Sequence, residues 1–197
     1  MMRRFLPLVL LVVAFLRCAE KCPFEPCDPE AGLLCGQVSP PREFSLSVCD
    51  LTVRTLTASR GLNPDWSFRI SSRFSGAQLV MLTVEDTIPV MLTYSLAVLD
   101  TQTCSIPSSC RDSLLAILGS VEIGIRISDA STALALTMIN PFVAFATEAE
   151  RVWFASQVIA DEDFDELVRE VGEGLRASPR DYLDGKTSPE IYARVSN

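Results

Sequence analysis

The sequence contains no histidine among its 197 residues. Histidine is the one side chain whose unperturbed pKa lies near neutrality, and it is the usual base in serine and cysteine hydrolases. Its absence excludes Ser-His-Asp and Cys-His catalysis. It also excludes zinc sites built from three histidines or from an HExxH helix.

Other signatures of chemistry are missing as well. The chain has no CxxC pair, which zinc knuckles and thiol redox enzymes need, and no GxSxG elbow, GxGxxG turn or P-loop. Asn63 and Asn140 each precede proline and Asn197 ends the given chain, so there is no N-glycosylation sequon. We therefore expect no cofactor and no metal, and the missing sequon favours a bacterial source over an animal or viral one.

Positive charge is scarce. The chain has 17 Lys and Arg against 25 Asp and Glu, a net charge of −8 and a pI near 4.6. Such a protein repels phosphate backbones and anionic lipids, so we expect no nucleic-acid partner and no electrostatic docking to membranes. Hydrophobic residues make up 48% of the chain, which is enough for the core of a single globular domain.

The N-terminus has the pattern of an export signal. Arg3 and Arg4 form a positive n-region, and an apolar run from Phe5 to Leu16 follows it. The run is shorter than the roughly 20 residues needed to span a bilayer and fits the h-region of a signal peptide. We expect the working protein outside the cytoplasm, in the periplasm or cell envelope or in the extracellular space.

The processing of this leader stays open between three routes. Val12-Val13-Ala14 has the small-residue pattern that signal peptidase prefers, whereas a cut near Cys18 or Ala19 leaves an even set of cysteines. Lipoprotein processing at Cys18 is the third route, although the residues before it fit a lipobox only loosely. The membrane would then be a partner through the lipid anchor alone.

The cysteines predict disulfide bonds, because exported thiols oxidise. The six candidates are Cys22, Cys27, Cys35, Cys49, Cys104 and Cys110. The stretch from Cys22 to Pro41 also holds five prolines, which predicts little regular structure and a need for covalent ties. We favour a local Cys104–Cys110 bond over a bond from either residue to the N-terminal segment, and the remaining pairings stay open.

The rest of the chain predicts an α+β fold. We expect an antiparallel or mixed sheet of about five to seven strands, C-terminal helices and a disulfide-tied N-terminal segment. The expected regions are a signal peptide or lipoprotein leader (1–19), a Cys/Pro-rich segment (20–41), a single α+β domain (42–177) and a loose tail (178–197).

Alternation of apolar and polar residues predicts the strands. They are expected at 44–56, as one long strand with a bulge or as two short strands, and at 66–71, 79–84, 89–99 and 121–127. We interpret the apolar stretch 131–147 as a buried strand followed by a turn at Asn140-Pro141 rather than as a transmembrane helix, because it is shorter than a bilayer span. Helices are expected at 112–118 with Ser109 as cap, after the Thr147–Glu150 capping box, and at about 163–176, where an apolar stripe recurs at helical spacing.

Two constellations have a structural explanation. Asp161, Asp163 and Asp165 begin like an EF-hand loop, but the sixth position is Glu166 and the twelfth is Gly172, so we interpret them as a helix start that the dipole favours. Six aromatic residues could line a ligand pocket, and we assign them to the core instead. They are Trp66, Phe68, Phe74, Tyr94, Trp153 and Phe154.

No residue is put forward as catalytic, cofactor-binding or metal-ligating. We expect an exported, disulfide-containing, non-enzymatic binding or assembly component of a cell envelope, with lipid anchoring at Cys18 left open. Its expected partner is another protein of the envelope or the exterior. The alternatives are a secreted host-interaction or virulence factor, bacterial or viral, and a hydrolase that uses paired carboxylates.

Overall fold

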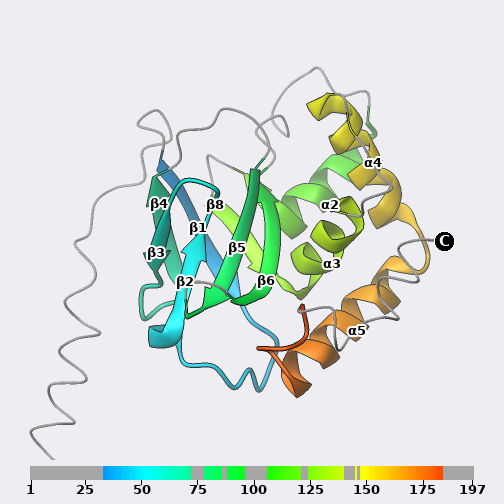
Figure 1. The fold of residues 1–197 in the computed structure, drawn as a ribbon. Helices are drawn as coiled ribbons and strands as arrows, with labels where there is room; N and C mark the ends of the chain where they lie inside the picture. The colour runs from blue at the N-terminus through cyan, green and yellow to red at the C-terminus, as the bar shows by residue number, and fades with distance from the viewer. Residues whose placement is uncertain are drawn as a thin grey trace, which may run out of the picture.

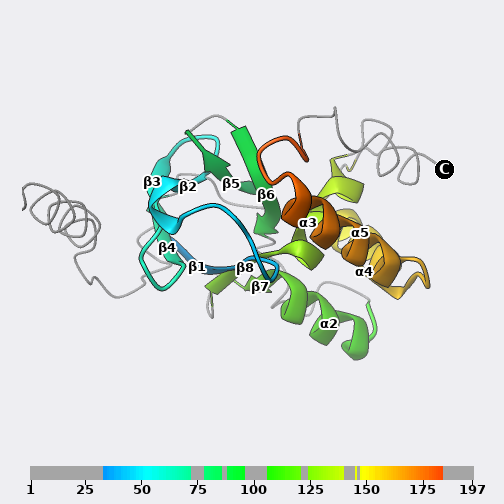
Figure 2. The same ribbon diagram turned by 90° about the horizontal axis from the view of Figure 1, so that it is seen from below.

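The computed structural model describes residues 33–71, 78–85, 88–95, 106–120, 124–139, 145 and 147–183. Over these residues the chain is an α+β fold with two four-stranded sheets and four α-helices (Figures 1 and 2). The strands are β1 (Leu33–Ser39), β2 (Leu51–Arg54), β3 (Ser59–Gly61), β4 (Ser67–Ser71), β5 (Gln78–Val84), β6 (Ile88–Ser95), β7 (Gly119–Ser120) and β8 (Gly124–Ser128). The helices are the short 3-10 turn η2 (Val48–Asp50) and α2 (Ser108–Leu118), α3 (Asp129–Met138), α4 (Glu148–Ala160) and α5 (Phe164–Ala177).

The strands divide between a mixed sheet and an antiparallel sheet. The first has the order β4-β1-β8-β7, in which β1 runs antiparallel to β4 and parallel to β8. The second has the order β3-β2-β5-β6 and is antiparallel throughout. The expectation of one sheet with about five to seven strands was therefore wrong. The chain passes from one sheet to the other after β1, β3, β4 and β6, so its eight strands divide four and four.

The two sheets lie in separate layers, and the helices gather beside them at the β6 and β8 side (Figures 1 and 2). Helix α3 contacts both β6 and β8, and α5 packs on α3. Inward-facing side chains of both sheets join the helices in one core. Its largest fully buried members include Val53, Phe68, Leu82, Ile127, Leu134 and Leu175.

Strand β1 lies where the sequence predicted little regular structure. Leu34 and Val38 alternate toward the core and are buried. Gly36 between them pairs with Phe68, and a Cβ at that position would collide with the Phe68 ring and with the carbonyl oxygen of Ile125. The glycine thus lets an aromatic ring lie directly on the backbone of β1.

Helix α3 replaces the buried strand that was predicted from residue 131 onward, and that prediction was wrong. The Ser128 side chain accepts a hydrogen bond from the Ser131 amide, and the Ser131 hydroxyl accepts one from the Ser128 amide at 2.8 Å. This is a serine version of the capping box. The helix is buried on nearly all sides, so no amphipathic period marks it in the sequence.

Two smaller expectations also failed. The segment predicted as a strand from Phe44 to Val48 is a loop that ends in η2, because Glu43 has a positive φ of 66° and Ser47 caps the 3-10 turn. Helix α2 begins after Pro107 without a side-chain cap, so Ser109 does not cap it.

The C-terminal helices were predicted correctly. Thr147 and Glu150 form the capping box of α4. The predicted stripe comprises Phe164, Leu167, Val168, Val171 and Leu175. Helix α5 buries four of these five residues, and Val168 is half-buried. It packs against α3 and α4, however, and α3 lies between it and the strands.

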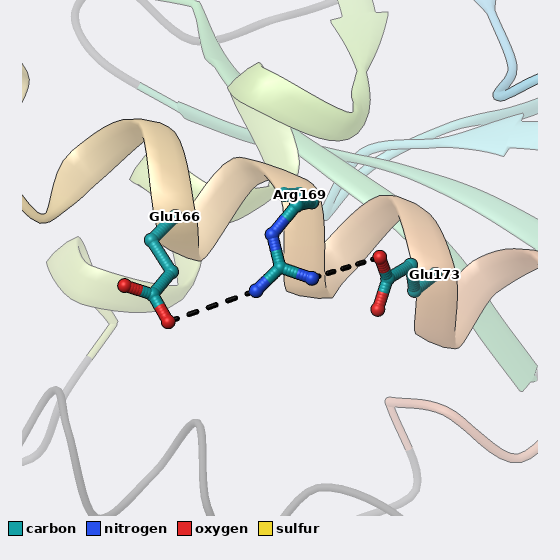
Figure 3. A network of polar contacts seen from close by, with 3 residues as sticks. All are labelled: Glu166, Arg169 and Glu173. Carbon is teal, nitrogen blue, oxygen red and sulfur yellow. Dashed lines mark hydrogen bonds and ion pairs between the residues drawn. The ribbon is translucent and has the colours of Figure 1, made fainter.

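The exposed face of α5 carries a small ionic network. Arg169 lies 2.8 Å from Glu173 and 3.6 Å from Glu166, and all three side chains are about half exposed (Figure 3). Ion pairs in solvent of this kind contribute little to stability. The buried face of α5 therefore holds the helix in place.

The first part of the expected loose tail belongs to the packed body. Tyr182 and Leu183 are buried, and the Tyr182 ring lies against Gly174 of α5. Arg180 forms a 2.9 Å ion pair with Glu85, which follows β5. Residues 184–197, the leader 1–19, Phe74 and the cysteines at 18, 22, 27 and 104 lie outside the described residues. None of the described helices is long and apolar enough to span a bilayer.

Candidate functional site

An open cavity of about 470 Å³ lies on the outer face of the mixed sheet. Strand β1 provides its floor, because the side chains that alternate with buried Leu34 and Val38 point away from the core. The lining residues are Cys35, Gly36, Gln37, Ser39, Asp65, Ser67, Gly124, Ile125 and Arg126.

A row of polar side chains crosses the cavity. Gln37 on β1 pairs in register with Ser67 on β4 and with Arg126 on β8. Gln37 and Arg126 are exposed and Ser67 is half-buried. The guanidinium of Arg126 also donates to the carbonyl oxygen of Ala116 at 3.3 Å, which holds it toward the end of α2.

The turn before β4 fixes a carboxylate at the other side of the cavity. Asp65 Oδ1 accepts hydrogen bonds from Ser67 Oγ at 2.7 Å and from the Ser67 amide at 3.0 Å. Asn63 donates to the same hydroxyl at 2.7 Å. The Trp66 carbonyl accepts from the Val38 amide at 2.9 Å, so the turn is tied to β1.

These bonds keep Asp65 ionised. The hydrogen bond from the Ser67 hydroxyl, followed by that from the Ser67 amide, lowers the pKa of the Asp65 carboxyl below its ordinary value. A general acid or base works best with a pKa near the working pH, so this carboxylate is unsuited to proton transfer at neutrality. The cavity instead offers a fixed negative charge, a positive charge, and hydroxyl and amide groups between them.

The structure describes three of the candidate cysteines. Cys35 in the cavity and Cys49 in η2 are both disulfide-bonded, and no disulfide joins two cysteines of the described residues. Cys110 is a half-buried free thiol in the first turn of α2. It therefore does not form the favoured bond to Cys104. That thiol lies on the helical side of the fold, away from β1.

The other sequence constellations do not form a site. Asp161 accepts from the Asp163 amide at 2.9 Å at the exposed start of α5, as expected for a helix start. Among the described residues no group of three or more acidic or cysteine side chains could hold a metal ion.

The aromatic residues do not converge on one pocket. Phe68 is in the core, Trp66 packs edge-on against Phe44 with 6.2 Å between the ring centroids, and Trp153 is 56% exposed. Tyr94 is half-buried, and burial raises the pKa of its phenol, which Arg151 partly offsets. Trp66, Tyr94 and Phe154 are partly buried against the core, so the assignment to the core is confirmed for Phe68 and in part for these three residues, and it is wrong for Trp153.

Comparisons with protein-family models, with curated proteins and with solved structures gave no significant match to this chain.

Proposed function

We propose that this protein is an exported, disulfide-containing, non-enzymatic binding or assembly component of a cell envelope. Its N-terminal segment is tied to the domain by disulfides, and its partner is another protein of the envelope or exterior. If the leader is processed as a lipoprotein, Cys18 carries the membrane anchor.

The observation that carries the proposal is the disulfide-bonded state of Cys35 and Cys49. Disulfides persist in exported proteins and are rare in the cytosol. The export signal read from residues 1–16 leads to the same compartment independently, because it rests on charge and hydropathy and not on cysteine.

The chemistry of the cavity supports binding over catalysis. Among the described residues that line it, Asp65 is the one carboxylate, whereas glycoside hydrolysis needs two. The carboxylate has a lowered pKa and already accepts two hydrogen bonds. Polar groups fixed on the open outer face of the mixed sheet suit contact with another chain.

In vivo photo-crosslinking tests the proposal. A photoreactive residue is placed at Trp153 on α4 or at Leu56 in the β2–β3 turn, whose side chains are 56% and 80% exposed. The two positions lie on different elements, so random collision would label both. We expect one of them to give a discrete adduct with an envelope protein, in the envelope fraction and only after irradiation. Recovery of the chain from the cytoplasm with a reduced Cys35 would contradict the proposal.

Separating the culture into medium, membranes and cytoplasm distinguishes the envelope component from the alternative, a secreted host-interaction factor. A secreted factor would accumulate in the medium without a lipid, whereas an anchored envelope component would take up labelled fatty acid at Cys18 and remain with the membranes.

A further inference from the structure

The cavity on the mixed sheet carries opposite charges at its two sides. Asp65 lies at the β4 side, where its Oδ1 accepts a 2.7 Å hydrogen bond from the Ser67 hydroxyl. Arg126 lies on β8, and its guanidinium donates to the carbonyl oxygen of Ala116 at 3.3 Å. Both charged residues are exposed, so each can reach a ligand. Between them lies Gln37 of β1, which pairs in register with Ser67 and with Arg126.

We propose that this cavity binds a short zwitterionic peptide of about three residues, whose ammonium group pairs with Asp65 and whose carboxylate pairs with Arg126. The inference deepens the proposed function and rests on its claim that the protein is a binding component. It names the chemistry that this face of the protein recognises, and it does not depend on the compartment in which the protein works.

The spacing of the strands sets the length of the ligand. Strands β4, β1 and β8 lie side by side (Figure 1), and neighbouring strands are about 4.7–4.9 Å apart. The row from Ser67 through Gln37 to Arg126 therefore covers two spacings, roughly 10 Å. Three extended residues span at most about 10–11 Å. A tripeptide laid across the strands thus brings its two charged ends to the two charged side chains.

The cavity has room for a ligand of this size. Its volume of about 470 Å³ lies within the range of about 300–1,000 Å³ in which proteins hold small ligands. Gly124 lines it two residues before Arg126 and has a φ of 103°, which favours glycine. Because glycine has no side chain, the backbone of β8 is open to a ligand at this position.

The groups between the charges match those of a peptide bond. The exposed Gln37 side chain has two amide donors and a carbonyl acceptor, which complement the C=O and N–H groups of a peptide. Gln37 is in register between Ser67 and Arg126, so a peptide that spans the charges places its backbone over this side chain. The exposed hydroxyl of Ser39 adds a further donor and acceptor in the cavity.

Charge favours a zwitterion over a ligand of one sign. An anion at Arg126 would meet the carboxylate of Asp65 in the same cavity, and the net charge of −8 repels anions at longer range. A cation at Asp65 would in turn meet Arg126. A zwitterion pairs with both side chains and carries no net charge. A peptide with both ends free is the simplest ligand of this length that does so.

Titration of the mature, oxidised protein with trialanine tests the inference. Amide chemical shifts of the isotope-labelled protein should change at Gln37, Ser67 and Arg126 and should saturate. N-acetyl-trialanine and trialanine amide each lack one terminal charge, so each should bind about tenfold or more weakly.

Three results of this titration would overturn the inference. One is the absence of a saturable shift up to roughly 5 mM trialanine. Another is equal affinity for the free, acetylated and amidated peptides. The third is sensitivity to only one of the two blocked ends, which would show that the cavity takes a ligand of one sign.

Single substitutions connect each charge of the peptide to its side chain. Asp65→Asn and Arg126→Gln should each weaken the binding of trialanine about tenfold or more. Asp65→Asn should not change the affinity for N-acetyl-trialanine, because the substitution and the acetylation remove the same ion pair. Arg126→Gln should likewise not change the affinity for trialanine amide. Arg60→Gln is the matched control, since Arg60 is exposed on β3 of the other sheet, and it should bind all three peptides as the native protein does.

The substitutions also separate this inference from the proposed function. Additive losses from Asp65→Asn and N-acetylation would show that the ammonium group binds elsewhere, which would overturn the inference. That result would leave the proposed function standing, because the crosslinks at Trp153 and Leu56 test the protein partner independently. Failure of those crosslinks together with intact trialanine binding would overturn the protein partner alone.

Discussion

Individual hydroxyl groups connect α3 to the second sheet. Strand β6 is at the edge of its sheet, where backbone groups would lack partners. Thr132 Oγ1 accepts from the Leu92 amide at 3.1 Å, and the Ser131 hydroxyl donates to the Leu92 carbonyl at 3.0 Å. Both hydroxyls are fully buried, and they supply the Leu92 amide and carbonyl with the hydrogen bonds that a neighbouring strand would otherwise provide.

Thr132→Val should therefore lower the free energy of unfolding by more than the net contribution of an ordinary hydrogen bond. The substitution keeps the shape and leaves the buried Leu92 amide without its acceptor, which costs about 1–3 kcal/mol. Thr137→Val is the control, because the Thr137 hydroxyl bonds only to carbonyls of its own helix. Urea unfolding gives the free energy of unfolding of both variants. Equal decreases would show that the hydrogen bond from Leu92 to Thr132 does not stabilise the protein more than a bond within α3 does.

Two glycines of α5 should respond differently to alanine. A Cβ at Gly174 would collide with the ring of Tyr182, whereas a Cβ at Gly172 would meet the Asp129 carboxylate at 3.3 Å. We expect Gly174→Ala to cost about 1–3 kcal/mol through overpacking. Gly172→Ala should be near neutral, because the gain in helix propensity of about 1 kcal/mol offsets a small adjustment. Thermal unfolding that ranks them in the reverse order would contradict the packing of Tyr182.

Asp65 should make stability depend on pH in the acid range. The hydrogen bonds from Ser67 lower the pKa of Asp65 in the folded protein below its ordinary value of 3.8. The stability that the ionised carboxylate contributes is therefore fully present above pH 3.8 and is lost as the pH falls through the folded pKa. Asp65→Asn should lose less stability than the native chain between neutral pH and about pH 3. Ser67→Ala should raise the pKa of Asp65 in an NMR titration. A stability difference between native and Asp65→Asn that does not change with pH would show that the Ser67 bonds do not form.

At the scale of elements, α5 is held by its buried face. Leu175 is fully buried in the core, whereas Arg169 forms only solvent-exposed ion pairs. Leu175→Ala should cost about 2–5 kcal/mol. Arg169→Ala should cost less than about 1 kcal/mol. Denaturant midpoints give both values, and a negligible effect of Leu175→Ala would place α5 outside the core.

The contrast between α5 and α3 shows what the sequence can predict. Helix α5 has one polar face, so Phe164, Leu167 and Val171 recur with a readable period. Helix α3 is buried on both sides by α5 and by β6, which removes the period and leaves only the Ser128–Ser131 cap as a signal. An apolar run of that length predicts a strand as readily as a helix.

The candidate site could be predicted only in its parts. Cys35 was identified as a disulfide candidate, and residues 66–71, which include Ser67, were predicted as a strand. The cavity itself requires β4, β1 and β8 to lie side by side, and these strands are far apart in the chain. Such register is set by tertiary packing, so no local pattern carries it.

For the whole molecule, the central claim is that this chain works outside the cytoplasm in an oxidised form. Its most direct test is the intact mass of the mature protein, isolated from a secretion-competent host with free thiols alkylated at once. We expect the leader to be absent, Cys35 and Cys49 to be unmodified by the alkylating reagent, and about two to three disulfides to be present. A chain that still begins at Met1 or Met2, or one with roughly four or more alkylated cysteines, would contradict the account.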